Sequence, residues 1–173
     1  MDHIIGSIAG RVFAALGLIA VAALFWQWYS ADRIATTFSH LTQVSNTLWP
    51  NYRNQPTRYG TAAIPANTII RLRALPDNAI CATNLCNEFG GTWSFTGSTN
   101  ILLASIDNVG DTDCTRLVNQ VPRSSGVTQV RVGATIAGAA AATANPAPVN
   151  PDTAASLCVN GTNAIQFAVS RVD

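Results

Sequence analysis

Cysteine and histidine are the residues of this chain whose types could support covalent catalysis or metal binding. The chain has four cysteines and two histidines: Cys81, Cys86, Cys114, Cys158, His3 and His40. A compact zinc site needs ligands at close spacing, and Cys81 and Cys86 have only distant cysteines and no nearby histidine to complete one. No Ser-His-Asp or Cys-His set stands at a plausible spacing for nucleophilic catalysis. We therefore expect no enzyme activity, no metal and no cofactor.

The cysteines are better suited to disulfide bonds. An even number of cysteines downstream of an apolar N-terminal segment favours two disulfides, and four cysteines allow three pairings. Local closure favours Cys81 with Cys86, which leaves Cys114 and Cys158 to close a loop worth about 4 kcal/mol in the chain-entropy account. Reduced, buried cysteines are the alternative.

Two further sets of polar residues have a structural interpretation. Asp107, Asp111 and Asp113 form an acidic group, but a calcium loop needs more ligands at fixed offsets. We interpret these aspartates as turn and helix-cap residues. His40 falls on the polar flank of a predicted helix, where we expect a solvated or interface side chain.

The charge balance argues against nucleic-acid binding. The chain of 173 residues has ten basic and nine acidic residues and a net charge of +1. All ten basic residues are arginines, and lysine is absent. The arginines are scattered along the sequence rather than gathered as in a phosphate-binding surface.

The N-terminal segment has the character of a membrane span. From Ile4 to Tyr29 the chain is almost wholly apolar, with Arg11 as its single full charge. About 25 such residues are enough to cross a bilayer core, and Trp26 and Trp28 resemble an interfacial aromatic belt. A cleaved signal peptide is the alternative, but the start lacks positive charge and the run exceeds a typical signal core. We expect the segment to be retained.

The same helix is predicted to continue beyond the apolar run. Ile34, Phe38, Leu41, Leu48 and, between the last two, Val44 or Ser45 recur at spacings of three and four, which predicts one apolar stripe on a polar helix. Pro50 is the first proline, where the helix should end. One helix of roughly 70 Å is therefore expected from near the N-terminus to about Trp49.

The remaining chain predicts a mixed fold. Alternating or apolar runs indicate strands over residues 92–96, 101–106, 127–132 and 164–169, the last with Ile165, Phe167 and Val169 on one face. Residues 114–121 have helical spacing, residues 68–72 fit a short helix or a strand, and residues 150–158 fit one helical turn. We expect the Ala-rich segment 136–149 to be a surface loop.

These elements predict an α+β protein in which the long helix packs on an antiparallel β-sheet. We expect a hydrophobic half-helix over residues 1–29 and a globular head over residues 30–173. The head divides into the amphipathic half-helix 30–50, a connecting loop 51–86, and the sheet with its disulfide-bounded C-terminal region 87–173.

In this order, the elements resemble a type IV pilin, and more narrowly a type IVb pilin. Asn87-Glu88-Phe89-Gly90-Gly91 resembles the Asn-Pro-Phe-Gly-Gly-type turn that leads into the sheet of such pilins, with Glu88 where proline is often found. Cys114 and Cys158 resemble the disulfide that encloses the family's variable C-terminal region.

The resemblance implies a processed and methylated N-terminus, expected at Met1. Pilins usually carry a glutamate at the fifth mature position, whereas this chain has Ile5, and the nearest carboxylate is Asp2. This departure leaves open the thin-pilus pilins of conjugative plasmids. We hypothesise that Arg11 is satisfied after assembly by Asp2 of a neighbouring subunit; snorkelling of Arg11 to the lipid headgroups is the alternative.

Small and aromatic residues of the same segment are further candidates for assembly. Gly6 and Gly10 form a G-x-x-x-G pattern that permits close helix packing in a filament core, although membrane spans contain such residues without that role. Phe13, Trp26 and Trp28 would pack between subunits.

The predicted function is that of a major pilin, held in the inner membrane until it polymerises with copies of itself into an extracellular filament. The resemblance implies a prepilin peptidase and assembly machinery as partners, with residues 111–158 as the surface for adhesion, aggregation or mating contact, through a possible surface receptor on another cell. A minor pilin or secretion pseudopilin is one alternative. A monomeric membrane-anchored periplasmic binding domain is the alternative from another class.

Overall fold

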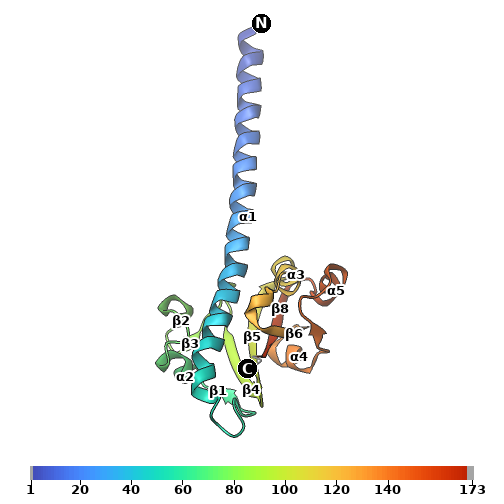
Figure 1. The fold of residues 1–173 in the computed structure, drawn as a ribbon. Helices are drawn as coiled ribbons and strands as arrows, with labels where there is room; N and C mark the ends of the chain where they lie inside the picture. The colour runs from blue at the N-terminus through green and yellow to red at the C-terminus, as the bar shows by residue number, and fades with distance from the viewer. Residues whose placement is uncertain (1, 171–173) are drawn as a thin grey trace. The chain divides into compact units, whose positions relative to one another are not determined.

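The computed structural model describes the backbone of residues 2–170 and the side chains of residues 13–22, 24 and 32–170. The chain divides into two compact units, residues 1–33 and residues 34–173. Each unit is described by itself below. Figure 1 shows the elements in chain order.

Helix α1 spans Asp2–Tyr52 and contributes residues to both units. It ends two residues beyond Pro50, rather than at the proline as predicted. Pro50 lacks one N–H donor, but the last turn is still completed because Arg53 N donates to Trp49 O at 2.9 Å. Among the residues that the structure describes, no helix combines the length and hydropathy needed to cross a membrane.

In the second unit, α1 buries the predicted apolar stripe. Ile34, Phe38, Leu41, Val44 and Leu48 are each at most 5% exposed. Spacings of three and four place these side chains on one face of the helix. This face packs on the sheet, where the rings of Phe38 and Phe167 meet edge to face with their centroids 5.8 Å apart.

The sheet has six antiparallel strands in the order β1-β4-β5-β8-β6-β7. The strands are β1 (Ala63–Ile64), β4 (Trp93–Ser98), β5 (Ile101–Gly110), β6 (Val127–Gly133), β7 (Asn145–Pro146) and β8 (Thr162–Ser170). Thus the predicted α+β class with an antiparallel sheet is confirmed.

Strand β5 is longer than predicted because it contains an irregularity. Its pairing with β8 shifts register between Ile106 and Val109, and Asn108 adopts a positive φ of 59°. An extra residue of this kind lets a strand bend and then resume its pairing. The strand therefore continues to Gly110 instead of ending at Ile106.

Strand β8 is buried on both faces, whereas the sequence predicted one buried face. It lies between β5 and β6, and Phe167 faces α1. On β6, Arg131 donates to Gln166 of β8 at 3.5 Å and to Ala140 O of α4 (Ile136–Ala141) at 3.0 Å. Helix α4 therefore covers the face of β8 opposite α1, and Gln166 is only 5% exposed.

The prediction of a surface loop over residues 136–149 was wrong, since α4 and β7 occupy it. Alanine has the highest helix propensity, and Thr135 Oγ1 caps α4 by accepting from Gly138 N at 3.1 Å. Ala139 is fully buried against Gly133, at a position where a Cβ would meet the α4 backbone. An Ala-rich helix carries too weak an apolar periodicity to be recognised from sequence.

The remaining elements are short. They are α2 (Ala66–Arg71), α3 (Asp111–Asn119), α5 (Pro151–Leu157), the 3-10 turns η1 (Asp77–Ala79) and η2 (Arg123–Ser125), and the hairpin of β2 (Ile80–Cys81) with β3 (Asn84–Leu85). The segment predicted as a short helix or a strand is therefore the helix α2. Helix α3 begins at Asp111, three residues before the predicted start.

Candidate functional site

The first candidate site is the apolar part of α1 in the first unit. Every large apolar side chain described there is more than half exposed: Phe13, Leu16, Leu18, Ile19, Val21 and Leu24. A helix that is apolar all round is normally buried in a membrane or a protein core. Contiguous exposed apolar surface of this kind marks a site of interaction.

Several predicted assembly residues belong to the same segment but lie outside the described side chains. These are Asp2, Gly6, Gly10, Arg11, Trp26 and Trp28, together with Met1. Phe13 is the member of the set that can be placed, and it is 74% exposed. The proposed pairing of Asp2 with Arg11 therefore stays a prediction.

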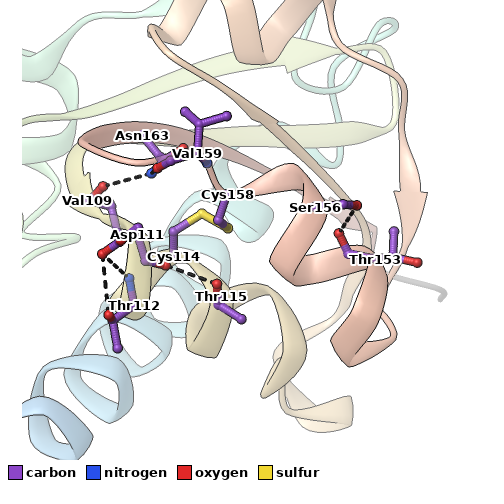
Figure 2. Close-up of a disulfide and its surroundings, with 10 residues drawn as sticks. All are labelled: Val109, Asp111, Thr112, Cys114, Thr115, Thr153, Ser156, Cys158, Val159 and Asn163. Atoms are coloured by element: carbon purple, nitrogen blue, oxygen red, sulfur yellow. Dashed lines mark hydrogen bonds between the residues drawn. A yellow bond between two sulfur atoms is a disulfide. The ribbon is translucent and has the colours of Figure 1, made fainter.

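The second candidate site is the region enclosed by the disulfide between Cys114 and Cys158, which are separated by 44 residues. Figure 2 shows this disulfide joining α3 to the segment that follows α5. Cys114 is fully buried and Cys158 is 9% exposed. The enclosed chain contains β6, α4, β7 and α5, so the disulfide ties a surface segment to the core of the second unit.

Asn163 supports the same region from β8. Its Oδ1 accepts from Val159 N at 3.0 Å, and its Nδ2 donates to Val159 O at 3.0 Å and to Val109 O at 3.4 Å. Figure 2 shows Asn163 between Val109 and Val159. A buried amide whose donors and acceptor are all used is well suited to hold the chain in a single conformation.

The other disulfide joins Cys81 to Cys86 across the β2–β3 hairpin, with a Cα–Cα distance of 5.8 Å. This is the pairing that local closure favours, and the Cys114–Cys158 disulfide is the pair that it leaves. Cys81 is exposed, and the backbone of Cys86 pairs with that of Thr92 in an isolated antiparallel β-bridge. This hairpin leads directly into the glycine-containing turn at residues 87–91.

Asn87 organises that turn. Its Oδ1 accepts from the backbone N–H groups of Phe89 and Gly91, both at 2.9 Å. Its Nδ2 donates to Asp107 O at 2.8 Å and to Thr92 O at 3.2 Å. The side chain thereby fastens the turn to β5, and a Cβ at Gly91 would collide with Asp107.

Glu88 carries a contact that the sequence did not reveal. Thr37 Oγ1 donates to Glu88 Oε2 at 3.0 Å, and His40 Nδ1 lies 2.5 Å from Glu88 Oε1. The side chains of His40 and Glu88 are only 8% and 13% exposed. The prediction of a solvated or interface His40 was therefore wrong, because the turn after β3 packs over this flank of α1.

The spacing of three residues between Thr37 and His40, which places both side chains on one helix face, was a signal for this contact. The departure at Glu88 from the usual proline was a second signal. The spacing of Thr37 and His40 does not show that they contact Glu88, and Glu88 in place of proline does not show that it contacts α1. Only the tertiary fold brings the three residues together.

The predicted turn and cap aspartates have local roles. Asp107 Oδ1 accepts from Thr92 N, and Asp111 Oδ1 accepts from Thr112 N at 2.7 Å. The N-cap of α3 is Gly110 rather than an aspartate. Over the part of the chain that the structure describes, no cluster of histidine, cysteine and acidic side chains is arranged to hold a metal ion.

The helix, the antiparallel sheet and the disulfide-bounded C-terminal region together define a class of protein, the type IVb pilin fold. The crystal structure of type IV b pilin from Salmonella typhi matches with a TM-score of 0.55 at 18% sequence identity. The match covers 79% of this chain and 99% of that chain. The predicted resemblance is confirmed at the level of the fold.

The family follows from the sequence. A family model described as PilS N terminal matches residues 31–170, and the chain therefore belongs to the PilS family of pilins. No match was found among curated proteins. The family and the fold together support a structural subunit of a pilus.

Proposed function

We propose that this chain is a major pilin, which polymerises through its N-terminal helix into an extracellular type IVb pilus. The observation that carries the proposal is the exposed apolar segment of α1 in a chain of this family. Burial of apolar surface is the main favourable term in protein association. Identical copies that bury such a segment against one another head to tail form an open helical filament.

Before assembly, the apolar segment would be held in the inner membrane as a single-pass anchor. A run of about 25 apolar residues in the sequence is long enough for this role. The prepilin peptidase and the assembly machinery would act on the chain there. Extraction into a filament would exchange lipid contacts for contacts with other subunits.

The disulfide-bounded region would supply the contacts of the filament with other cells or other filaments. Most side chains of α5 and of the segment before it are exposed. The disulfide and Asn163 hold this surface to the sheet, while Val130, Val149 and Ala154 of the same region are buried in the core. Such a surface is suited to adhesion, aggregation or mating contact.

The test is electron microscopy of sheared surface material from cells that express the chain, with mass spectrometry of its main protein. Thin filaments made chiefly of this chain, containing both disulfides, are expected. A chain that stays in the membrane fraction and enters no filament would refute the proposal and favour a monomeric anchored domain. A chain present only in trace amounts in filaments would identify a minor pilin.

A further inference from the structure

Four of the ten arginines gather in the connecting segment after α1. Residues 51–76 contain Arg53, Arg58, Arg71 and Arg73 and no acidic residue, and the exposed Asp77 is the first acidic residue after them. Arg53, Arg71 and Arg73 are exposed. This group of four side chains is called the arginine face below.

Aromatic contacts place the arginine face at one end of the second unit. Arg58 lies over the ring of Trp49 at 5.2 Å, and the rings of Tyr52 and Tyr59 are 5.6 Å apart. A shallow pocket is lined by Arg71 together with Tyr52 and Gln55. Arg53, Arg58 and Arg71 therefore lie around the C-terminal end of α1, and Arg73 follows two residues after Arg71.

Backbone hydrogen bonds connect the chain at this end of the second unit to the β4–β5 hairpin. Tyr59 N donates to Thr99 O at 3.1 Å, and Thr99 N donates to Gly60 O at 2.7 Å. Thr99 lies in the turn between β4, which ends at Ser98, and β5, which begins at Ile101. The arginine face is thus next to the start of β5.

Acidic side chains lie beyond the other end of the same strand. Strand β5 has ten residues and runs directly into α3, whose first turn carries Asp111 and Asp113. The Cys114–Cys158 disulfide fastens α5 beside α3, and α5 carries the exposed Asp152 in its first turn. These three aspartates are called the acidic end. Arg116 stands in the last turn of α3.

The two charged groups are separated by the length of the sheet. Ten residues of β-strand extend about 30 Å. In Figure 1, α3 and the chain beside β1 are drawn at opposite ends of the sheet. Residues 132–170 contain a single charged side chain, Asp152, so little other charge competes on that part of the chain.

We propose that the arginine face of one copy binds the acidic end of the next copy, so that the second units join head to tail. This inference rests on the proposed function and names the polar contact that accompanies burial of the apolar helix. A contact between two different surfaces of identical chains forms an open filament when its rotation does not close into a ring. Complementary charge adds orientation and specificity to an association driven by apolar burial.

The absence of lysine allows a direct test by cross-linking. The variant Arg71→Lys introduces a single side-chain amine into the chain and keeps the positive charge. A carbodiimide then joins that amine to a carboxylate only where the two are in contact. Filaments of this variant should yield covalent dimers whose linked peptides join position 71 to Asp111, Asp113 or Asp152. Because these sites are about 30 Å apart within one copy, such a link arises between copies.

Two controls accompany the cross-linking. Filaments of the parent chain have no side-chain amine and should not give these linked peptides. The variant Arg131→Lys places its amine on β6 opposite Gln166, which pairs with Ser105 in the middle of β5, and should not link to the acidic end. Absence of a link from position 71, or links only to other acids, would overturn the proposed contact. Filaments formed by the parent chain would leave the pilin function standing in either case.

Charge reversal provides an independent test. The variants Arg71→Glu/Arg73→Glu and Asp111→Arg/Asp113→Arg should each lower filament yield several-fold, and their combination should restore much of it. Oxidised Cys114–Cys158 in the membrane pool would show that each variant folds. Equal yields for parent and single reversals, or no recovery in the combination, would refute the contact. A parent chain that forms no filament would instead refute the proposed function.

Discussion

At the scale of single residues, Glu88 is the side chain whose role depends most on its surroundings. It accepts a hydrogen bond from Thr37 and pairs with His40, at positions that are largely shielded from water. A buried polar group that loses its partner keeps its desolvation penalty without compensation. The turn at residues 87–91 and the helix α1 are therefore joined by a polar contact in addition to apolar packing.

Replacing Glu88 should destabilise the second unit. We expect Glu88→Ala to lower the free energy of unfolding by about 2–3 kcal/mol, because Thr37 loses its hydrogen-bond acceptor and the buried His40 loses the carboxyl group beside it. Urea denaturation of the detergent-solubilised full chain, followed by circular dichroism, measures this change. Asp77→Asn, at an exposed position on η1, is the control and should change stability by less than about 0.5 kcal/mol. Equal stabilities of Glu88→Ala and the control would contradict the role of the pair.

Gly91 is needed for the close approach between the turn and β5. A Cβ at this position would collide with both the side chain and the backbone of Asp107. We expect Gly91→Ala to destabilise the chain by about 2 kcal/mol, since overpacked sites must displace their neighbours. Gly110→Ala is the matched control, because a Cβ there meets nothing within 4 Å. The same denaturation assay should find a smaller effect for Gly110→Ala, and the reverse order would refute the argument.

At the scale of elements, the two disulfides restrain very different lengths of chain. The Cys81–Cys86 disulfide closes a hairpin, whereas Cys114–Cys158 spans 44 residues and connects α3 with the end of α5. A longer closed loop removes more entropy from the unfolded chain. The larger loop also contains α4 and α5, which are short helices with little stability of their own.

Removing each disulfide by a pair of serine substitutions should therefore have unequal effects. We expect Cys114→Ser/Cys158→Ser to lower the free energy of unfolding by about 4 kcal/mol, and Cys81→Ser/Cys86→Ser by about 2 kcal/mol. Urea denaturation of the two variants compares them directly. A larger loss for the hairpin disulfide would show that chain entropy is not the dominant contribution here.

At the scale of the whole molecule, the exposed apolar surface and the hydrophobic core belong to different units of the chain. The first unit exposes large apolar side chains, while the second unit contains the hydrophobic core and both disulfides. If the first unit drives assembly as proposed, a change in it should alter assembly without altering the fold of the second unit.

Phe13 provides the test at this scale. It is 74% exposed, so Phe13→Ala should leave unfolding of the second unit unchanged. The loss of its apolar area on assembly is worth about 2 kcal/mol per subunit, which corresponds to more than tenfold in the equilibrium for subunit addition. The amount of sheared filament at fixed expression measures the effect. Gln129→Ala, at an exposed residue of β6, is the control, and equal filament loss in both would refute a specific role for Phe13.

The sequence by itself determined the elements whose signals are local. The apolar run and the three-and-four spacing predicted α1, alternation predicted the hairpin of β4 and β5, and the short separation of Cys81 and Cys86 favoured the disulfide pairing that the structure contains. Each of these patterns depends on residues that are close along the chain. Periodicity and loop closure are sufficient to recognise them.

The tertiary structure alone decided which distant residues meet. Burial of both faces of β8 depends on α4, an Ala-rich helix that matters only because it packs on Gly133. The pairing of His40 with Glu88 depends on how a turn 48 residues away folds over α1. Similarly, Arg58 and the aspartates of α3 lie at opposite ends of β5. These arrangements arise from long-range packing and pairing, and single-chain periodicity carries no information about them.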